Sequence, residues 1–134
     1  MHIVVDDREQ AGGLPDALER LLRRPPDLRR LELGDVIVDG RLIIERKTLA
    51  DLTASIADGR LGRQCSRLAA AARSGCPCLI LIEGEEEDAR TSFAFDAIRA
   101  AILSLQLDWR LPVIQTNDVR DTAGWIVAAA RAIS

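Results

Sequence analysis

Aromatic side chains are scarce in this 134-residue chain, which has two Phe, two Trp and no Tyr, or 3% of its residues. A surface that stacks the bases of single-stranded nucleic acid needs several aromatic rings, so the composition argues against such a binding module. The hydrophobic share of 48% is high enough to exclude a disordered chain. The length fits one domain with its own core.

Cysteine and histidine are also few. The odd set Cys65, Cys76 and Cys78 does not indicate a disulfide framework, and with His2 as the one histidine the spacing matches no common zinc site. No apolar segment approaches the roughly 20 residues that span a bilayer, and the N-terminus shows no signal-peptide pattern. We therefore expect no membrane partner, and a protein of the cytoplasm (nucleoid-associated) or of the nucleus that is not secreted.

Lysine is the rarest charged residue, because the chain has 17 Arg and a single Lys. The net charge of −3 argues mildly against a protein that coats DNA by charge alone. The charge is uneven, however. Residues 1–75 hold 13 Arg and Lys against 12 Asp and Glu, and residues 76–134 hold 5 against 9, so the two parts carry +1 and −4. If DNA binds, we expect it on the first part.

Apolar periodicity and turn residues predict a mixed sheet between helices, an α/β fold. In the first predicted helix we expect Leu14, Leu18, Leu21 and Leu22 to lie on one face. Asp39-Gly40 indicates a hairpin turn, and Glu85 to Asp88 a solvated polar loop. The predicted strands cover 3–5, 28–33, 36–38, 42–44, 78–83 and 113–114, and the predicted helices cover 15–24, 49–57, 61–73, 95–107 and 118–133.

Acidic residues and the lone lysine gather around the predicted hairpin. The hairpin brings Asp35, at the start of one arm, beside Glu45, at the end of the other. Strand side chains alternate, so Glu45 and Lys47 share a face while Arg46 points the other way. Two carboxylates can hold a divalent cation, and an ammonium can position a water or offset developing charge. This pattern favours hydrolysis of a phosphodiester. The alternative is that Lys47 lies beside the acids by chance, since the one lysine must fall somewhere in the chain.

A second acidic cluster, Asp6-Asp7-Arg8-Glu9, follows the first predicted strand. Such a cluster is more often a solvated turn. Beside a predicted metal site, Asp6 and Glu9 become candidates for further ligands.

Several segments resemble one known family. Gly34-Asp35, Glu45-Arg46-Lys47 and Asp51 match the GDx(n)ERKx(3)D signature of the XPF-type structure-specific endonucleases, which include archaeal Hef-like proteins. Further segments follow the family's order along nearly the whole chain. They are Val5 to Glu9, similar to VDxRE; Asp58 to Leu61 with Gln64, similar to "(D/N)GRL…Q"; Leu79 to Gly84, similar to "hydrophobic-IEG"; and the helices from Ala97-Ile98-Arg99 onward.

The resemblance implies a restriction-endonuclease-like PD-(D/E)XK core, Mg²⁺ or Mn²⁺ dependence, and cleavage of flaps, forks or related branched DNA. Carried over by position, it implies catalytic roles for Asp35, Glu45, Lys47, Arg46, Asp51 and Arg8, and metal ligation by Asp35, Glu45, Asp6 and Glu9. Many relatives carry a helix-hairpin-helix module after the nuclease domain, whereas this chain ends at Ser134. We therefore expect one nuclease domain over 1–134, from a truncated or a minimal form.

Arginines at helical spacing predict a path for DNA. Arg60, Arg63 and Arg67, with Gln64, lie on one side of the helix predicted over 61–73, and Arg46 would extend the track. A solvated helix face explains the same spacing. The last two predicted helices are unusually apolar, and the family resemblance implies a homodimer or heterodimer through them.

Three other functions fit parts of the pattern. One is a non-catalytic DNA-binding or scaffold subunit of a nuclease dimer, which the complete set of acids disfavours. Another is a binding module in which a metal is purely structural. The third is a hydrolase of small phosphoesters, against which the arginines argue.

Overall fold

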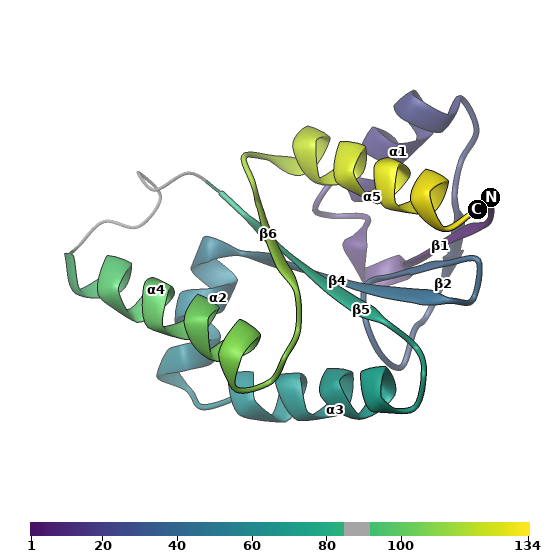
Figure 1. The fold of residues 1–134 in the computed structure, drawn as a ribbon. Coiled ribbons are helices and arrows are strands. Elements are labelled where there is room, and N and C mark those ends of the chain that lie inside the picture. Colours follow the sequence, from purple (N-terminus) through teal and green to yellow (C-terminus); the bar gives the residue numbers. More distant parts are fainter. Residues whose placement is uncertain (85–91) are drawn as a thin grey trace.

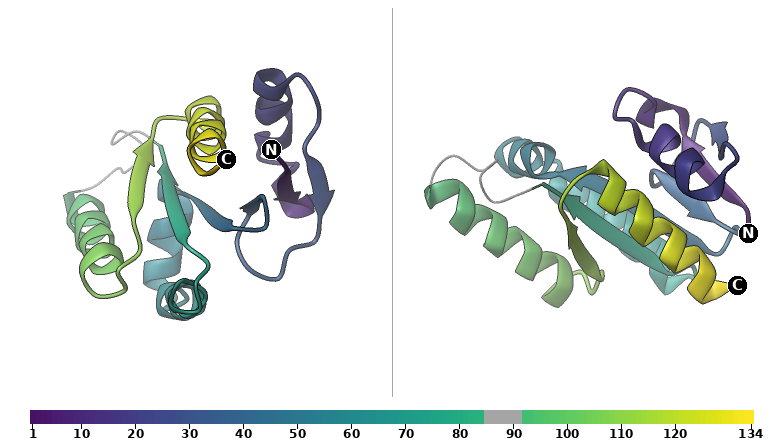
Figure 2. Two further views of the ribbon diagram at one scale, coloured as in Figure 1. Left: turned by 45° about the vertical axis from the view of Figure 1, so that its right-hand side comes forward. Right: turned by 90° about the horizontal axis from the view of Figure 1, so that it is seen from above.

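The computed structural model describes residues 1–84 and 92–134, which form a mixed sheet with helices on both faces (Figures 1 and 2). The six strands lie in the order β2-β1-β3-β4-β5-β6. The elements are β1 (Ile3–Asp6), the short 3-10 helix η1 (Asp7–Glu9), α1 (Leu14–Leu22), β2 (Asp27–Arg29), β3 (Val36–Val38), β4 (Leu42–Thr48), α2 (Leu49–Ala57), α3 (Leu61–Arg73), β5 (Cys78–Glu83), α4 (Ser92–Leu107), β6 (Val113–Thr116) and α5 (Val119–Ile133).

Parallel and antiparallel pairs occur in the same sheet, as predicted. Strands β1-β3-β4 are antiparallel, whereas β2 joins β1, and β5 and β6 join β4, in parallel. Strand β5 is buried over almost its whole length, because helices cover it on both sides. The predicted α/β class is confirmed.

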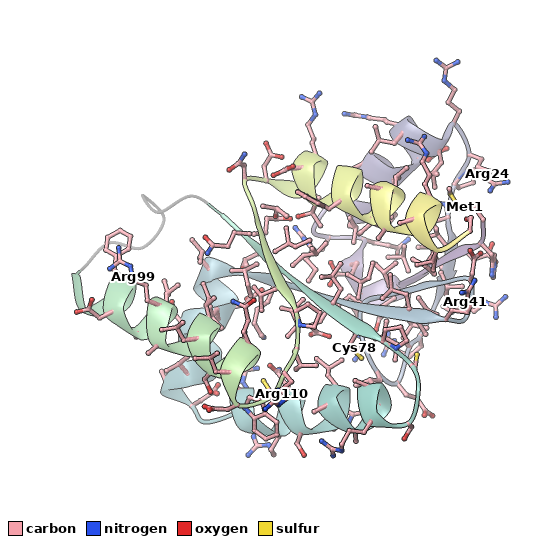
Figure 3. The ribbon with its side chains drawn as sticks, in the orientation of Figure 1. Met1, Arg24, Arg41, Cys78, Arg99 and Arg110 are labelled. Atoms are coloured by element: carbon pink, nitrogen blue, oxygen red, sulfur yellow. The ribbon has the colours of Figure 1, made fainter. Side chains whose placement is uncertain are left out.

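Two apolar cores hold the helices to the sheet (Figure 3). Helices α1 and α5 pack on one face through residues such as Leu18 and Ile126. Helices α2, α3 and α4 pack on the other face through residues such as Leu52 and Leu105. Cysteines 65, 76 and 78 are all free. In the part of the chain that the structure describes, no helix combines the length and the apolarity that crossing a membrane requires.

Two glycines with positive φ, Gly34 and Gly40, shape the hairpin that carries the candidate site. Asp39 and Gly40 both have positive φ, 51° and 63°, which suits the tight turn that an Asp-Gly pair predicts. Gly34, just before β3, has φ +78°, and a Cβ there would lie 2.4 Å from Ile43 Cγ2. The chain therefore approaches β4 closely at the residue that precedes Asp35.

One local expectation is wrong. The strand predicted over 28–33 ends at Arg29, because β3 pairs on the far side of β1 and residues 30–35 must cross the end of that strand. Of the leucines predicted to share one face of α1, Leu14 and Leu18 are buried in the core and Leu21 is exposed. The polar loop predicted at Glu85 to Asp88 lies outside the described residues.

Candidate active site

The two predicted carboxylates face one pocket. Asp35 and Glu45 both line a cavity of about 350 Å³ that opens between the start of β3, the middle of β4 and helix α3. The other lining residues are Arg8, Glu32, Leu33, Gly34, Gln64, Arg67 and Leu68. The prediction that the hairpin brings Asp35 and Glu45 to the same side is confirmed.

Backbone hydrogen bonds hold Asp35 from two strands. Its N–H donates to the carbonyl of Ile44 (2.9 Å), and its own carbonyl accepts from the N–H of Asp6 (2.8 Å). Its carboxylate Oδ2 accepts from the N–H of Arg46 at 2.8 Å. The carboxylate is thus fixed by the strand that carries Glu45.

The two acids are partly buried beside one another, and their pKa values reflect this. Burial, followed by the charges of Glu45 and Glu9, raises the pKa of Asp35 to about 8. Burial also raises the pKa of Glu45, against the opposing effect of Lys47. Like-charged, partly desolvated carboxylates repel one another, and a divalent cation between them would remove that repulsion.

Lys47 lies two residues beyond Glu45 on β4 and does not line the pocket. Only 8% of it is exposed, and its Nζ donates to Ser55 Oγ on α2 at 3.1 Å. Its charge acts on Glu45, where it lowers the pKa against the effect of burial, and on the buried Cys65. Sequence reasoning did not find Ser55, because a buried serine in a helix carries no distinctive pattern.

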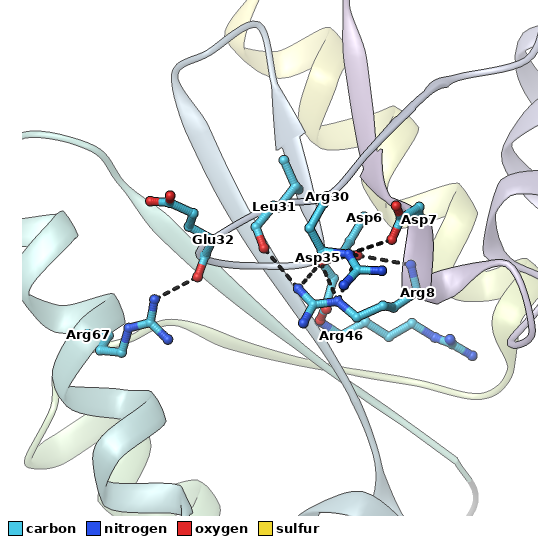
Figure 4. Close-up of polar contacts among 9 residues, drawn as sticks. All are labelled: Asp6, Asp7, Arg8, Arg30, Leu31, Glu32, Asp35, Arg46 and Arg67. Carbon is cyan, nitrogen blue, oxygen red and sulfur yellow. Dashed lines mark hydrogen bonds and ion pairs between the residues drawn. The ribbon is translucent and has the colours of Figure 1, made fainter.

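Arg8 reaches the pocket and is clamped to Asp6 (Figure 4). Its Nε donates to both Asp6 oxygens, at 3.0 and 3.1 Å, and its Nη2 donates to the carbonyl of Leu31 at 2.8 Å. The hydrogen bond from Arg8 holds the pKa of Asp6 down, at about 2. The structure therefore does not support Asp6 as a metal ligand, because Arg8 occupies both of its oxygens.

Arg46 points to the other face of the sheet, as strand alternation predicts. It is 10% exposed, and its guanidinium donates to Glu9 Oε2 (2.8 Å) and to Glu83 Oε2 (2.6 Å). This burial corrects its predicted role as a DNA contact beside the arginines of α3. Glu9 gives its Oε2 to Arg46 and also lies close enough to Asp35 to raise the pKa of that acid, so its role as a metal ligand stays a prediction.

The remaining predicted residues fall into two groups. Gln64 and Arg67 line the pocket, and Arg67 donates to the carbonyl of Glu32 at 2.6 Å. Arg60 and Arg63 lie on the exposed side of the same helix, and Arg60 pairs with Asp58 at 2.7 Å. Asp51 is exposed in the first turn of α2 and does not line the pocket, so the structure does not bring it to the acids.

A metal ion at this site would need ligands beyond the protein side chains. Within residues 1–84 and 92–134, no three Asp, Glu, His or Cys side chains are placed to hold one ion together. Asp35 and Glu45 offer hard oxygen donors, and Mg²⁺ in proteins often uses one or two carboxylates with water and substrate phosphate. The pair fits such an ion.

Several known proteins are similar to this chain in sequence. The ERCC4 domain family model matches residues 5–129. The chain is 32% identical to the "3'-flap repair endonuclease Xpf" of Saccharolobus solfataricus over 92% of its own length and 52% of that protein. It is 30% identical to the "Crossover junction endonuclease MUS81" of Oryza sativa subsp. japonica, over 92% of this chain and 19% of that one.

Solved structures agree with this grouping. XPF from Aeropyrum pernix, in a complex with DNA, superposes with a TM-score of 0.85 at 34% identity, covering 98% of this chain and 64% of that one. The chain thus spans about half the length of the flap endonuclease relative. The predicted nuclease fold is confirmed, and the chain belongs to the ERCC4 domain family, the family of XPF-type nuclease domains.

Proposed function

We propose that this chain is the catalytic domain of a divalent-metal-dependent endonuclease that cuts flaps, forks or related branched DNA. The observation that carries the proposal is the pair of partly buried carboxylates, Asp35 and Glu45, in one pocket, with the chain's single lysine buried two residues beyond Glu45 on the same strand. The named activities of its relatives support the same reaction.

The residues divide the chemistry between them. Asp35 and Glu45 would hold Mg²⁺ or Mn²⁺, which when bound polarises the scissile phosphate and acidifies water. Lys47 supplies a buried positive charge beside Glu45 that offsets negative charge developing on the phosphate. Its hydrogen bond to Ser55 holds the ammonium against α2.

Arginines border the pocket on two sides and would guide the phosphate backbone. Arg8 lies at the β1 side, and Arg67 lies across the opening on α3 (Figure 4). Arg60 and Arg63 extend the same helix face toward its N-terminus. Each phosphate contact adds a salt-sensitive share of affinity without reading sequence, which suits recognition of a DNA shape.

Gln64 would meet the substrate directly. Its Oε1 is buried and accepts no hydrogen bond from the described residues. It lines the pocket beside the two acids. A buried acceptor without a donor is unfavourable, and a donor group delivered with the substrate or its water would satisfy it.

Cleavage of labelled DNA tests the proposal. Flap, fork, bubble and duplex substrates would be incubated with Mg²⁺, Mn²⁺ or EDTA. We expect metal-dependent cutting of a branched substrate by the wild type, and a loss of at least about 100-fold for Asp35→Asn and Lys47→Ala. DNA binding in EDTA should change little in Asp35→Asn, because its pocket keeps its shape.

Other outcomes separate the competing functions. DNA binding by the wild type without incision under any metal would identify a non-catalytic subunit. A rise in melting temperature with metal, again without incision, would identify a structural ion. Faster hydrolysis of a small phosphodiester than of any DNA would point to a small-molecule hydrolase.

A further inference from the structure

A buried polar network lies on the face of the sheet opposite the candidate active site. Glu83, the last residue of β5, accepts two hydrogen bonds from the Arg46 guanidinium, from Nε at 2.9 Å and from Nη2 at 2.6 Å. It accepts a third from Thr122 Oγ1 on α5 at 2.6 Å. Because that proton is committed to Glu83, the 2.7 Å contact of Thr122 with Thr116 must have Thr116 as the donor.

The network is packed so that the guanidinium has one position. Thr116 and Thr122 are fully or almost fully buried, and Glu83 is 8% exposed. Nη1 of Arg46 donates to Glu9, so the guanidinium is held from two sides by carboxylates. A Cβ on Gly12 would lie 2.6 Å from this Nη1, so a side chain at position 12 would require the guanidinium to shift from where the two carboxylates hold it.

This network connects to the site through the backbone of Arg46. The N–H of Arg46 donates to Asp35 Oδ2 at 2.8 Å, so the position of this peptide sets the orientation of the carboxylate. Its neighbours along β4, Glu45 and Lys47, project from the other face of the strand. Fixing the Arg46 side chain therefore fixes the part of β4 that holds the Asp35 carboxylate and presents Glu45 to the pocket.

A contribution to folding stability is a poor explanation for burying the Arg46–Glu83 ion pair. Burying an ion pair costs desolvation that its attraction often fails to recover, and apolar residues of similar size frequently serve as well. A bidentate guanidinium–carboxylate pair adds geometric constraint instead. Such constraint behind metal-ligating carboxylates commonly determines how well they work.

We infer that Glu83, held by Thr122, is a positioning residue of the active site, which aims Asp35 through the Arg46 peptide. The inference deepens the proposed function, on which its catalytic consequence rests. The geometric part stands on the hydrogen bonds alone. The network also makes helix α5 part of the site's support, although that helix lies on the opposite face of the sheet from the pocket.

Amide hydrogen exchange, followed by NMR in EDTA, tests the positioning without metal or DNA. The N–H of Arg46 should exchange at least tenfold faster in Glu83→Gln than in wild type, relative to other β4 amides. Thr122→Val, which removes the hydroxyl without changing the shape, should have the same effect, and Thr122→Ser should restore slow exchange. Val127→Ala is the matched control, because it loosens α5 without touching the network.

Cleavage by the same variants completes the test. We expect Glu83→Gln and Thr122→Val to lose roughly 10- to 100-fold in single-turnover rate, with affinity for DNA in EDTA within twofold of wild type. The control Val127→Ala should keep the wild-type rate well below its melting temperature. If Arg46 exchanges equally in Glu83→Gln and Val127→Ala, the inference is wrong. If exchange changes as expected and the wild type cuts no DNA, the proposed function fails and the positioning role stands.

Discussion

At the scale of single residues, the candidate site is a source of instability in the metal-free protein. Asp35 and Glu45 are partly desolvated beside one another, and Glu9 adds a further negative charge nearby. Natural proteins commonly keep such unfavourable groups where function requires them. The energetic cost should be measurable as a pH dependence of folding.

The sign follows from the pKa of Asp35, which rises from 3.8 to about 8 on folding. The folded protein therefore binds the proton of the Asp35 carboxyl more tightly than the unfolded chain does. Binding of this proton adds to the free energy of unfolding in full below pH 3.8, and this contribution is lost as the pH rises toward 8. At pH 8 in EDTA, Asp35→Asn should therefore melt about 5 °C or more above wild type, since even one pKa unit is about 1.4 kcal/mol. The difference should shrink toward pH 5.

Thermal unfolding by circular dichroism between pH 5 and 8.5 measures this effect. Asp96→Asn serves as the control, because that side chain is 83% exposed and should leave the pH dependence unchanged. A melting temperature of Asp35→Asn equal to or below that of wild type at pH 8 would contradict the prediction.

At the scale of elements, local signals were sufficient for most of the fold. The Asp39-Gly40 turn and the apolar run of β5 are both encoded within a few neighbouring residues, and each is present in the structure. The extent of β2 was not predictable in this way. It ends early because of the order of strands in the sheet, which no local pattern contains.

The candidate site also has features that local sequence patterns predict and features that they do not. Alternation along β4 correctly placed Glu45 and Lys47 opposite Arg46, but it does not tell whether the far face is solvent or protein. The partner that buries Arg46, Glu83, lies 37 positions away in the sequence. The sequence pattern alone therefore predicts a DNA contact for Arg46, and it does not reveal the buried hydrogen-bond network of Arg46 with Glu83. The "hydrophobic-IEG" segment that contains Glu83 was the one available signal.

The approach of Gly34 to β4 gives a prediction at this scale. Gly34→Ala should destabilise the protein by roughly 2–4 kcal/mol, because its Cβ would collide with Ile43 and its φ is positive. Gly40→Ala, also at positive φ but with open space around it, should cost only about 1 kcal/mol. Urea unfolding of both variants makes the comparison, and equal losses would show that the close contact is unimportant.

At the scale of the whole molecule, the two C-terminal helices do not form one continuous face. Helices α4 and α5 pack on opposite sides of the sheet and flank its edge strand, β6 (Figure 2). Exposed apolar side chains occur on both helices, among them Leu103 and Leu107 on α4 and Trp125 on α5. We propose that the β6 edge with its two helices is the surface through which nuclease domains pair.

Size-exclusion chromatography with light scattering tests this pairing. Leu107→Glu should weaken a dimer at least tenfold, since the loss of one apolar contact and the burial of a charge exceed about 1.4 kcal/mol. Leu28→Glu is the matched control, because it changes an exposed leucine on β2, the opposite edge strand of the sheet. A wild-type chain that stays monomeric at high concentration would contradict the proposal.

The composition of the site also makes it unusually easy to observe. Lys47 is the only lysine in the chain, and its ammonium is buried beside Glu45. Feeding isotope-labelled lysine would therefore place a single NMR reporter next to the candidate site, with no other side chain of that type to assign. Titration of metal or DNA into such a sample would report occupancy of the pocket from one resonance.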